Sequence, residues 1–249
     1  MNPTIIVEAP MEYVTLTLPS PEENLACDEA LLEQCDAGDG PELLRIWEAP
    51  QPFVVLGYAN RAESEVHLEA CRARRMPVVR RCTGGGTVVQ GPGCLNFSLI
   101  ARIPSSGPFA SLTGTAHAIL TRHQHALQPL VDAPITREPP TDLALGGRKC
   151  SGNAQRRKRH AFLFHGTLLY GFDVAAVAQW LPLPSKQPAY RQGRPHHAFL
   201  TNLPLSASTL TAALRNAWQA RAHSSEVPAS RIQELVHTRY ANAAWTFRT

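Results

Sequence analysis

The stretch RRCTGGGTVVQGPGCLN, residues 80–96, places three consecutive glycines between a pair of arginines and a β-branched run. Glycine lets the backbone adopt a positive φ and lets a ligand approach the main chain closely. Exposed N–H groups in such a turn form a concavity that attracts anions. Two interpretations therefore stay open, a glycine-rich hairpin turn and an anion-binding turn. A P-loop is excluded, because no GK[ST] sequence follows the glycines.

Composition narrows the class of protein. The 249 residues fit one large domain, or one domain with a small appendage, and the hydrophobic fraction of 44% allows a sizeable core. The net charge of +4 is mild and suits an anionic ligand or an acidic partner. The basic run RRKR at 156–159 has no aromatic residues interleaved with it, so we interpret it as a solvated turn and expect no nucleic acid partner.

The apolar runs, the first residues and the cysteine spacing bear on where the protein is located. No run of about 18 apolar residues is present, so we expect no membrane-spanning segment. The first residues lack a basic region followed by a long apolar stretch, which argues against a signal peptide. The six cysteines, at positions 27, 35, 71, 82, 94 and 150, form no CxxC pair. This pattern predicts reduced thiols in a cytoplasmic protein and neither a disulfide framework nor a zinc site.

Short apolar runs and segments with helical periodicity predict interspersed strands and helices. Helices are expected at 20–35, 63–75, 109–130, 173–181, 207–222 and 228–239, and strands at 43–49, 52–59, 76–82, 86–90, 94–103, 142–157 and 159–171. The last two strand segments are expected to pair as a hairpin, and 185–203 to form a loop. Because most strands lie in adjacent hairpins, we expect an α+β fold with a mainly antiparallel or mixed sheet flanked by helices.

A second constellation lies in GGRKCSGNAQRR, residues 146–157, and FHGTLL, residues 164–169. A lysine among bulky neighbours extends outwards to solvent, whereas Lys149 is framed by Gly147 and Gly152 and can lie close to a bound ligand. His165 and Thr167 are two residues apart, so they share one face of their strand. Ordinary surface exposure for the lysine and ordinary strand packing for the other two remain the alternatives.

Four linked segments carry a family resemblance: NLACDEALL, RRCTGGGTVV followed by GCLNFS, DLALGGRKCSGNAQRR, and HGTLL. In order and spacing they resemble the lipoate–protein ligases, from about residue 22 to 204, with a weaker echo in RYANAAWTFR, and linked motifs are more specific than a single one. The resemblance implies membership of the lipoate/biotin ligase and octanoyltransferase superfamily. It also implies a catalytic domain like the cores of biotin ligases and class II aminoacyl-tRNA synthetases.

The resemblance implies a reaction as well. Lipoate is activated by ATP to lipoyl-AMP, and a lysine of an acceptor lipoyl-domain protein then attacks the mixed anhydride to form an amide. Mg²⁺ is expected wherever pyrophosphate leaves, although no all-protein metal site is visible in the sequence. Some ligases of this kind need an accessory domain, fused or supplied as a separate chain. We expect residues 1–204 to form the catalytic domain and 205–249 a short helical extension.

Site residues follow from the same motifs. Lys149 is the expected catalytic cation near the substrate carboxylate and α-phosphate. Either Arg80 or Arg81 is the second cation, because adjacent strand residues point apart, and the family pattern favours Arg81. The remaining expected substrate- and nucleotide-binding residues are Thr83, Gly84, Gly85, Gly86, Thr87, Asn96, Asp142, Ser151, Gly152, His165, Gly166, Thr167, Lys186, Arg191 and Arg194. His196 and His197 are expected to serve the loop structurally and not as metal ligands.

One departure from the family pattern stands out, because Gln90 and Gly91 occupy the positions where many members carry a His–Asp pair. An octanoyltransferase acting through a cysteine thioester without ATP is the main alternative function. Cys150 adjoins Lys149, but on a strand the two would point to opposite faces, and residues 135–145 contain no thiol. A non-catalytic paralogue that binds lipoyl-proteins is the third possibility.

Overall fold

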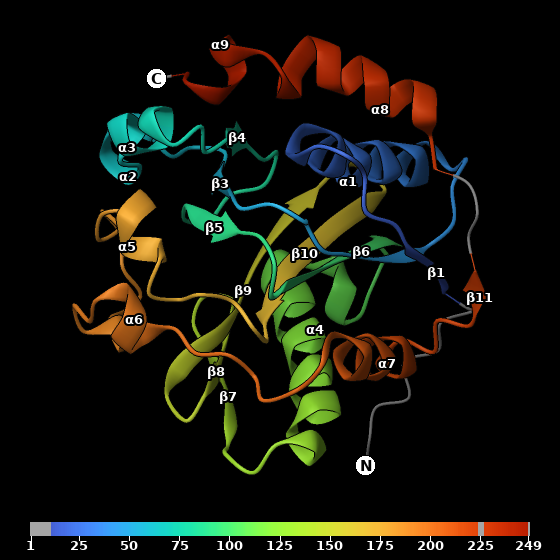
Figure 1. Cartoon of the computed structure of the whole chain (residues 1–249). Helices are drawn as coiled ribbons and strands as arrows, with labels where there is room; N and C mark the ends of the chain where they lie inside the picture. The colour runs from blue at the N-terminus through green and yellow to red at the C-terminus, as the bar shows by residue number, and fades with distance from the viewer. Residues whose placement is uncertain (1–10, 224–226, 249) are drawn as a thin grey trace.

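The computed structural model describes residues 11–223 and 227–248. An eight-stranded mixed sheet runs through the molecule in the order β11–β1–β2–β6–β10–β9–β8–β7 (Figure 1). Its strands are β1 (Glu12–Thr15), β2 (Leu43–Trp47), β6 (Cys94–Arg102), β7 (Ile135–Glu138), β8 (Asp142–Leu145), β9 (Arg148–Arg157), β10 (Ala161–Leu169) and β11 (Ala222–His223). The pairs β11–β1 and β1–β2 are parallel and the others antiparallel, which confirms the expected fold class.

A second, three-stranded sheet carries the glycine turn. Its order is β4–β3–β5, with β3 (Phe53–Leu56), β4 (Val78–Arg80) and β5 (Val88–Gln90). Strand β3 is parallel to β4 and antiparallel to β5, so the connection between β4 and β5 crosses one end of this sheet. That connection holds the three glycines, Gly84 to Gly86.

Helices cover both faces of the large sheet, with α1 and α8 on one side and α4 and α7 on the other (Figure 1). The helices are α1 (Pro21–Ala37), α2 (Ala62–Glu65), α3 (Leu68–Ala73), α4 (Leu112–Leu127), α5 (Val177–Trp180), α6 (His196–Phe199), α7 (Ala207–Ala217), α8 (Ala229–Leu235) and α9 (Ala243–Thr246). Short 3₁₀ turns span Pro108–Ala110, Gln128–Leu130 and Ala189–Arg191, and a π turn spans Val236–Tyr240. In the described part of the chain no helix is long and apolar enough to cross a membrane.

Helix α1 begins where the sequence predicts it. The Ser20 side chain accepts a hydrogen bond from the Glu23 backbone N–H, and the Glu23 carboxylate accepts one from the Ser20 N–H. Such a capping box satisfies backbone donors that have no partner inside the helix. The helix ends at Gly38, whose φ of 90° suits glycine.

The structure differs from the expected elements in several regions of the chain. The helix predicted at 63–75 is interrupted, because buried Val66 is extended and the His67 N–H donates to the Trp180 carbonyl in α5. The predicted loop at 185–203 contains the turn Ala189–Arg191 and helix α6. The helix predicted at 207–222 ends at Ala217, and the chain after it pairs with β1 as strand β11, whereas the helix predicted at 228–239 is present as α8 and the π turn that continues it.

The segment 205–249 shares the core of the preceding chain. Leu210, Leu214 and Trp218 belong to the hydrophobic cluster under α4, and Ile232 and Leu235 belong to the cluster under α1. We propose that this segment is an integral extension of the catalytic domain, because its apolar side chains complete both cores.

Candidate active site

Polar side chains line one face of the large sheet in two rows. Asp142, Gly152, Thr167 and Asn96 are direct partners across β8, β9, β10 and β6. Directly opposed residues of antiparallel strands share a face, so these four residues form one row. A second row, two residues further along, contains Ala154, His165, Ser98 and Arg45. Helix α1 and the small sheet lie over this face, whereas α4 packs on the other.

A β-bulge brings Lys149 to the polar face. The register between β8 and β9 shifts so that Ala144 pairs with Lys149 and Leu143 pairs with Ser151, which leaves Cys150 as the extra residue. A bulge of this kind re-aims side chains. Cys150 consequently lies fully buried in the core cluster under α4, while the Lys149 ammonium lies over Gly152 on the opposite face, as the expected divergence of the two side chains requires.

Gly152 provides the space for the Lys149 ammonium. A Cβ built at residue 152 would lie 2.7 Å from both Cε and Nζ of Lys149, so the lysine curls back over a strand position without a side chain. There Nζ forms an ion pair with Asp142 Oδ1 at 2.9 Å. The Tyr190 hydroxyl donates to the other carboxylate oxygen at 2.7 Å. Burial and the Asp142 charge raise the pKa of Tyr190, so it stays a donor at neutral pH.

Arg81 braces the glycine turn from inside. Its Nη2 donates to the carbonyls of Gly84 at 2.6 Å and Gly86 at 2.8 Å, and its Nε donates to Thr83 Oγ1 at 3.0 Å. Burial lowers the pKa of Arg81 to about 10, so the guanidinium remains charged at neutral pH. Its Nη1 makes no hydrogen bond to the described residues and is open to a ligand.

Only the middle glycine is required by the turn itself. Gly85 has a φ of +87°, which disfavours other residues, and its carbonyl packs so closely on Gly57 that a Cβ there would lie 2.1 Å from it. Gly84 and Gly86 have no positive φ, and a Cβ at either would meet no atom within 4 Å. The fold leaves open space above these two residues, as an anion-binding turn requires.

A buried network supports the turn from α1. Asp28 accepts from Arg45 Nη1 at 2.7 Å, from Ser98 Oγ at 2.7 Å and from His165 Nδ1 at 3.1 Å, and His165 Nε2 lies 2.7 Å from Thr83 Oγ1. Burial opposes ionisation of Asp28, but the Arg45 charge and the hydrogen bonds outweigh it, so the pKa of Asp28 is lowered. This charged network fixes the orientation of the His165 ring and, through Thr83, of Arg81.

Arg80 has a structural position. It is fully buried, and its guanidinium donates to the carbonyls of Gly57, Tyr58 and Asn60 and to those of Trp245 and Thr246. The two adjacent arginines therefore diverge as expected, with Arg81 against the glycines and Arg80 against α9. Thr87 also contacts Asn60, one of the residues that Arg80 holds, because its hydroxyl donates to Asn60 Oδ1 at 3.3 Å.

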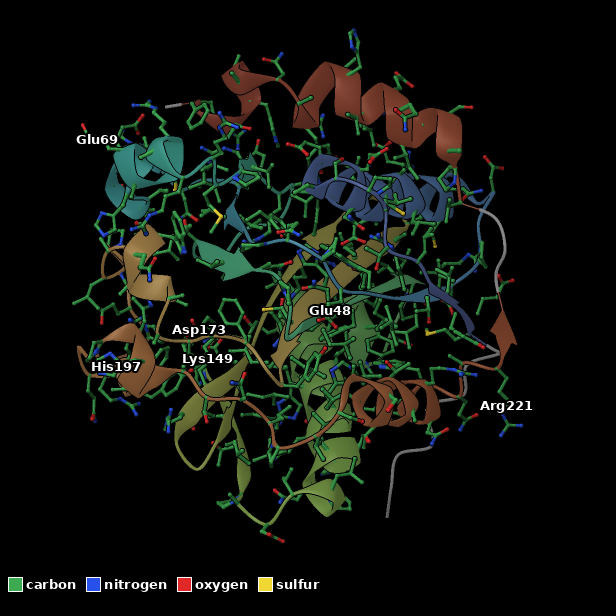
Figure 2. The ribbon with its side chains drawn as sticks, viewed as in Figure 1. Glu48, Glu69, Lys149, Asp173, His197 and Arg221 are labelled. Carbon is green, nitrogen blue, oxygen red and sulfur yellow. The ribbon has the colours of Figure 1, made fainter. Side chains whose placement is uncertain are left out.

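The later cationic loop closes over the start of β9. Arg194 donates to the Gly147 and Tyr190 carbonyls, and buried Arg191 donates to the Arg194 carbonyl and stacks on Phe199. Lys186 is exposed. His196 is buried and contacts the Pro182 carbonyl at 3.0 Å, whereas His197 is exposed on α6 at the edge of the molecule (Figure 2).

The structure separates some predicted residues from this site. Ser151 pairs with Leu143 and Leu168, and Gly166 accommodates the Asn153 side chain, so both belong to the sheet face that packs on α4. Successive residues of a strand point to opposite faces of the sheet, so Ser151 and Gly166 lie on the face opposite their neighbours Gly152 and Thr167. Sequence reasoning missed Asp28, Arg45, Ser98 and Tyr190, because a charge in a helix or a hydroxyl in a strand carries no signal until its partners are known.

All six cysteines are buried. Burial raises the pKa of Cys150, Cys82 and Cys94 to about 12 and that of Cys27 and Cys35 to about 11, and it also raises the pKa of Cys71. A thiol that stays protonated and covered is a poor nucleophile.

Comparison with known structures defines the class of fold. A crystal structure of lipoate-protein ligase A bound with ATP superimposes with a TM-score of 0.82 at 23% identity, covering 96% of this chain and 99% of the other. A bipartite lipoate protein ligase from Thermoplasma acidophilum gives a TM-score of 0.81 at 21% identity, covering 95% and 96%. The fold is that of a lipoate ligase catalytic domain.

Sequence comparison then assigns the family. The lipoyl protein ligase A/B catalytic domain matches residues 20–214, and the chain belongs to this family. A putative lipoate-protein ligase A from Aeropyrum pernix is 32% identical over 203 residues, 81% of this chain and 72% of the relative. An octanoyltransferase LipM from Moorella thermoacetica is 32% identical over 191 residues, 67% of each. The protein is thus an enzyme of the lipoate ligase and octanoyltransferase family.

Proposed function

We propose that the protein is an ATP-dependent lipoate–protein ligase, which forms lipoyl-AMP and transfers the lipoyl group to a lysine of a lipoyl-domain protein. The observation that carries this choice over the transferase is the state of the thiols. A cysteine thioester requires a reachable thiolate, and burial holds all six thiols protonated and covered. Activation by ATP needs cations and an open glycine turn, and both are available at the site.

The side chains suit the two substrates of the first step. The turn at Gly84 and Gly86 offers backbone beside open space, where an acyl-phosphate can approach closely. Lys149 presents a compact ammonium on the polar face of the large sheet, where it is paired with Asp142. If an anionic substrate replaced Asp142 as its partner, the ammonium would lie at the reacting centre. Arg81 would add its free Nη1 as a second donor.

Mg²⁺ would depend mainly on the nucleotide. Among the described residues, no group of three or more His, Cys, Asp or Glu side chains is placed to hold a metal ion. Asp142 is the carboxylate beside Lys149, and both of its oxygens already accept from protein donors. The chain therefore fits Mg²⁺ that arrives with the ATP phosphates and keeps its own waters. The ion would neutralise charge on the departing pyrophosphate.

The remaining expectations belong to the same proposal. Acceptor lipoyl domains are the macromolecular partners, and the protein works in the cytoplasm. Lys186 and Arg194 contact the triphosphate, whereas buried Arg191 supports Arg194 from inside the loop. A separate accessory chain is a further expectation, and the bipartite ligase of Thermoplasma acidophilum is a precedent for one. The non-catalytic alternative is disfavoured by the assembled lysine, glycine turn and arginine.

One pair of measurements tests the choice of function. Pure protein with lipoate, Mg²⁺ and ATP is expected to release pyrophosphate and accumulate lipoyl-AMP. The same protein with an octanoyl-carrier protein is expected to show no acyl thioester by intact mass spectrometry, and Cys150→Ala is expected to keep full activity. An acyl adduct on Cys150, lost together with activity in Cys150→Ser, would establish the transferase instead.

A further inference from the structure

Three arginine side chains converge on an exposed tyrosine beside the glycine turn. Tyr58 follows β3 and is 44% exposed, and the Arg248 guanidinium carbon lies 3.8 Å from the centre of its ring. A hydrogen bond with Arg248 and the charge of that arginine lower the pKa of the Tyr58 hydroxyl. The charges of Arg156 and Arg239 lower this pKa further. All three guanidinium groups are therefore within electrostatic reach of one surface hydroxyl.

An aromatic ring holds two of these arginines in place. The centre of the Trp245 ring lies 4.3 Å from the guanidinium carbon of Arg248 and 4.9 Å from that of Arg239. A guanidinium that stacks on a ring keeps the N–H donors at its edge available. Tyrosine, tryptophan and arginine are enriched among the residues that dominate the energy of protein interfaces. We call the five residues that meet here the arginine patch: Tyr58, Arg156, Arg239, Trp245 and Arg248.

The arginine patch carries more positive charge than its own contacts compensate. Buried Glu29 forms ion pairs with Arg156 at 3.2 Å and with Arg239 at 2.5 Å. Arg248 forms no ion pair with any residue that the structure describes. One carboxylate is thus shared by two of the three guanidinium groups, and the third has none. A surface with this excess is complementary to an anionic partner.

Hydrogen bonds join the arginine patch to the residues that lead into the glycine turn. The Tyr58 N–H donates to the Thr83 carbonyl at 2.8 Å. Arg156 Nη1 donates to the Cys82 carbonyl at 3.3 Å. Because Cys82 and Thr83 directly precede the three glycines, the patch borders the turn itself.

Strand β9 gives the distance between the arginine patch and the Lys149 ammonium. Gly152, which lies under the ammonium, and Arg156 are four residues apart, so they share the polar face at a separation of about 13 Å. Ala154 lies between them, and a Cβ built at Gly85 would be 3.8 Å from its side chain. The patch and the proposed reaction centre therefore flank the same turn.

The footprint of a protein partner reaches this far. A lysine side chain extends about 6 Å from its Cα, so the domain that presents a target lysine must come close to the acyl carbon. A standard interface of about 800 Å² on each partner has a radius of about 16 Å. This radius exceeds the separation between Gly152 and Arg156. An acceptor domain centred on the reaction centre would thus cover the arginine patch.

The nucleotide accounts less well for the charge. The two phosphoryl groups beyond an α-phosphate at Lys149 do not span the distance to Arg156, and the adenosine is neutral. We propose that the arginine patch docks the acceptor lipoyl domain through carboxylates on the surface around its target lysine, an inference that rests on the ligase function proposed above.

The test measures docking and chemistry separately. Binding of a purified, unmodified lipoyl domain is titrated calorimetrically, at low and at high salt, for the wild type, Arg248→Glu and Arg248→Lys. Arg221→Glu is the matched control, because Arg221 is exposed and lies on the side of the molecule away from Lys149 (Figure 2). Pyrophosphate release from ATP and lipoate, with hydroxylamine to trap the adenylate, reports the chemistry in the absence of the domain.

We expect Arg248→Glu to bind the domain about tenfold more weakly at low salt, because a repulsive contact replaces an attractive one, and the difference should shrink at high salt. Arg248→Lys keeps the charge and should bind within about threefold of the wild type. Pyrophosphate release and hydroxylamine trapping should be unchanged in both variants. Arg221→Glu should match the wild type in every measurement.

Wild-type binding of the domain is also expected to weaken as salt is added. Salt-independent binding by the wild type, unchanged binding by Arg248→Glu, or an equal loss in Arg221→Glu would each overturn the proposal. A raised KM for ATP in Arg248→Glu with unchanged binding of the domain would assign the patch to the nucleotide instead. Absence of pyrophosphate release by the wild type would contradict the proposed function alone, because the binding titration still tests the docking surface.

Discussion

Lys149 and Gly152 act as a unit, because the lysine occupies the space that any larger residue at 152 would fill. The two glycines that frame the lysine in the sequence suggested close approach to a ligand, and in the structure Gly152 leaves the space that the Lys149 ammonium itself occupies. The bulge that places Cys150 in the core was not foreseeable, since the register shift opposite Leu143 and Ala144 depends on β8. The opposite faces of Lys149 and Cys150 were predicted from simple alternation, and the bulge produces the same result.

Substitutions at this pair have a defined expectation. Lys149→Ala and Lys149→Arg should both abolish lipoyl-AMP formation, because a planar guanidinium does not replace a compact ammonium. Gly152→Ala should lower the rate at least tenfold, since its Cβ would displace Cε and Nζ of the lysine. The ion pair with Asp142 is partly exposed, so loss of the lysine should change the free energy of unfolding by about 1 kcal/mol or less.

Pyrophosphate release and thermal unfolding check these expectations together. Gly171→Ala is a suitable control, because a Cβ there would be in ordinary contact, 3.8 Å from Gly93. Near-normal adenylate formation by Lys149→Ala would contradict the catalytic role and leave Lys149 as an ordinary surface residue.

At the scale of elements, the contact between α4 and α7 contains a buried histidine. Trp218 Nε1, just beyond α7, donates to His123 Nε2 at 2.8 Å. Burial and the nearby Arg122 charge lower the pKa of His123 to about 3. The folded protein therefore keeps this ring neutral, while the unfolded chain protonates it near its ordinary pKa. The stability that results is complete above about pH 6.5 and is lost as the pH falls towards 3.

The expected slope is at most about 1.4 kcal/mol per pH unit in that window. His123→Gln should retain an acceptor for Trp218 and remove this part of the slope. Urea unfolding of both proteins at pH 7.5 and pH 5 measures the difference. His196, whose pKa burial also lowers, contributes with the same sign in both proteins, so the comparison isolates His123. Parallel slopes for the two proteins would contradict the assignment.

Elements that depend on local signals were predictable from the sequence, whereas those that depend on long-range contacts were not. Helix α1 was predictable because its cap, its proline and its terminal glycine are all local. The break between α2 and α3 was not, because the His67 N–H is satisfied by the Trp180 carbonyl far along the chain. The predicted strands around the glycine turn are confirmed, since β-branched residues and turn signals mark them directly.

At the scale of the whole molecule, Arg80 joins α9 to the loop at Gly57, which packs against the glycine turn. Deletion of residues 241–249 would remove the Trp245 and Thr246 carbonyls from a fully buried guanidinium. We expect a loss of about 3 kcal/mol in the free energy of unfolding. Weaker binding of ATP should accompany it, because the same guanidinium holds Gly57 and Gly57 packs on Gly85.

Chemical denaturation and ATP titration of the shortened chain measure both effects. Phe247→Ala serves as a control, because this side chain is exposed and its loss removes no carbonyl from Arg80. Wild-type stability of the deleted chain would show that Arg80 finds other partners. At this end the sequence showed only a weak family resemblance. It contained no signal that carbonyls of the last residues bind the buried guanidinium of Arg80.

The link between Arg80 and Trp245 also constrains biosynthesis. A ribosome makes the glycine turn early, but the carbonyls that hold its neighbouring arginine emerge 165 residues later. Until then the nascent chain carries a charged side chain with half of its partners missing, next to an unfinished substrate loop. A polypeptide that stops before α9, through a nonsense codon or a damaged message, is thus expected to bind ATP more weakly and to be more open to proteases.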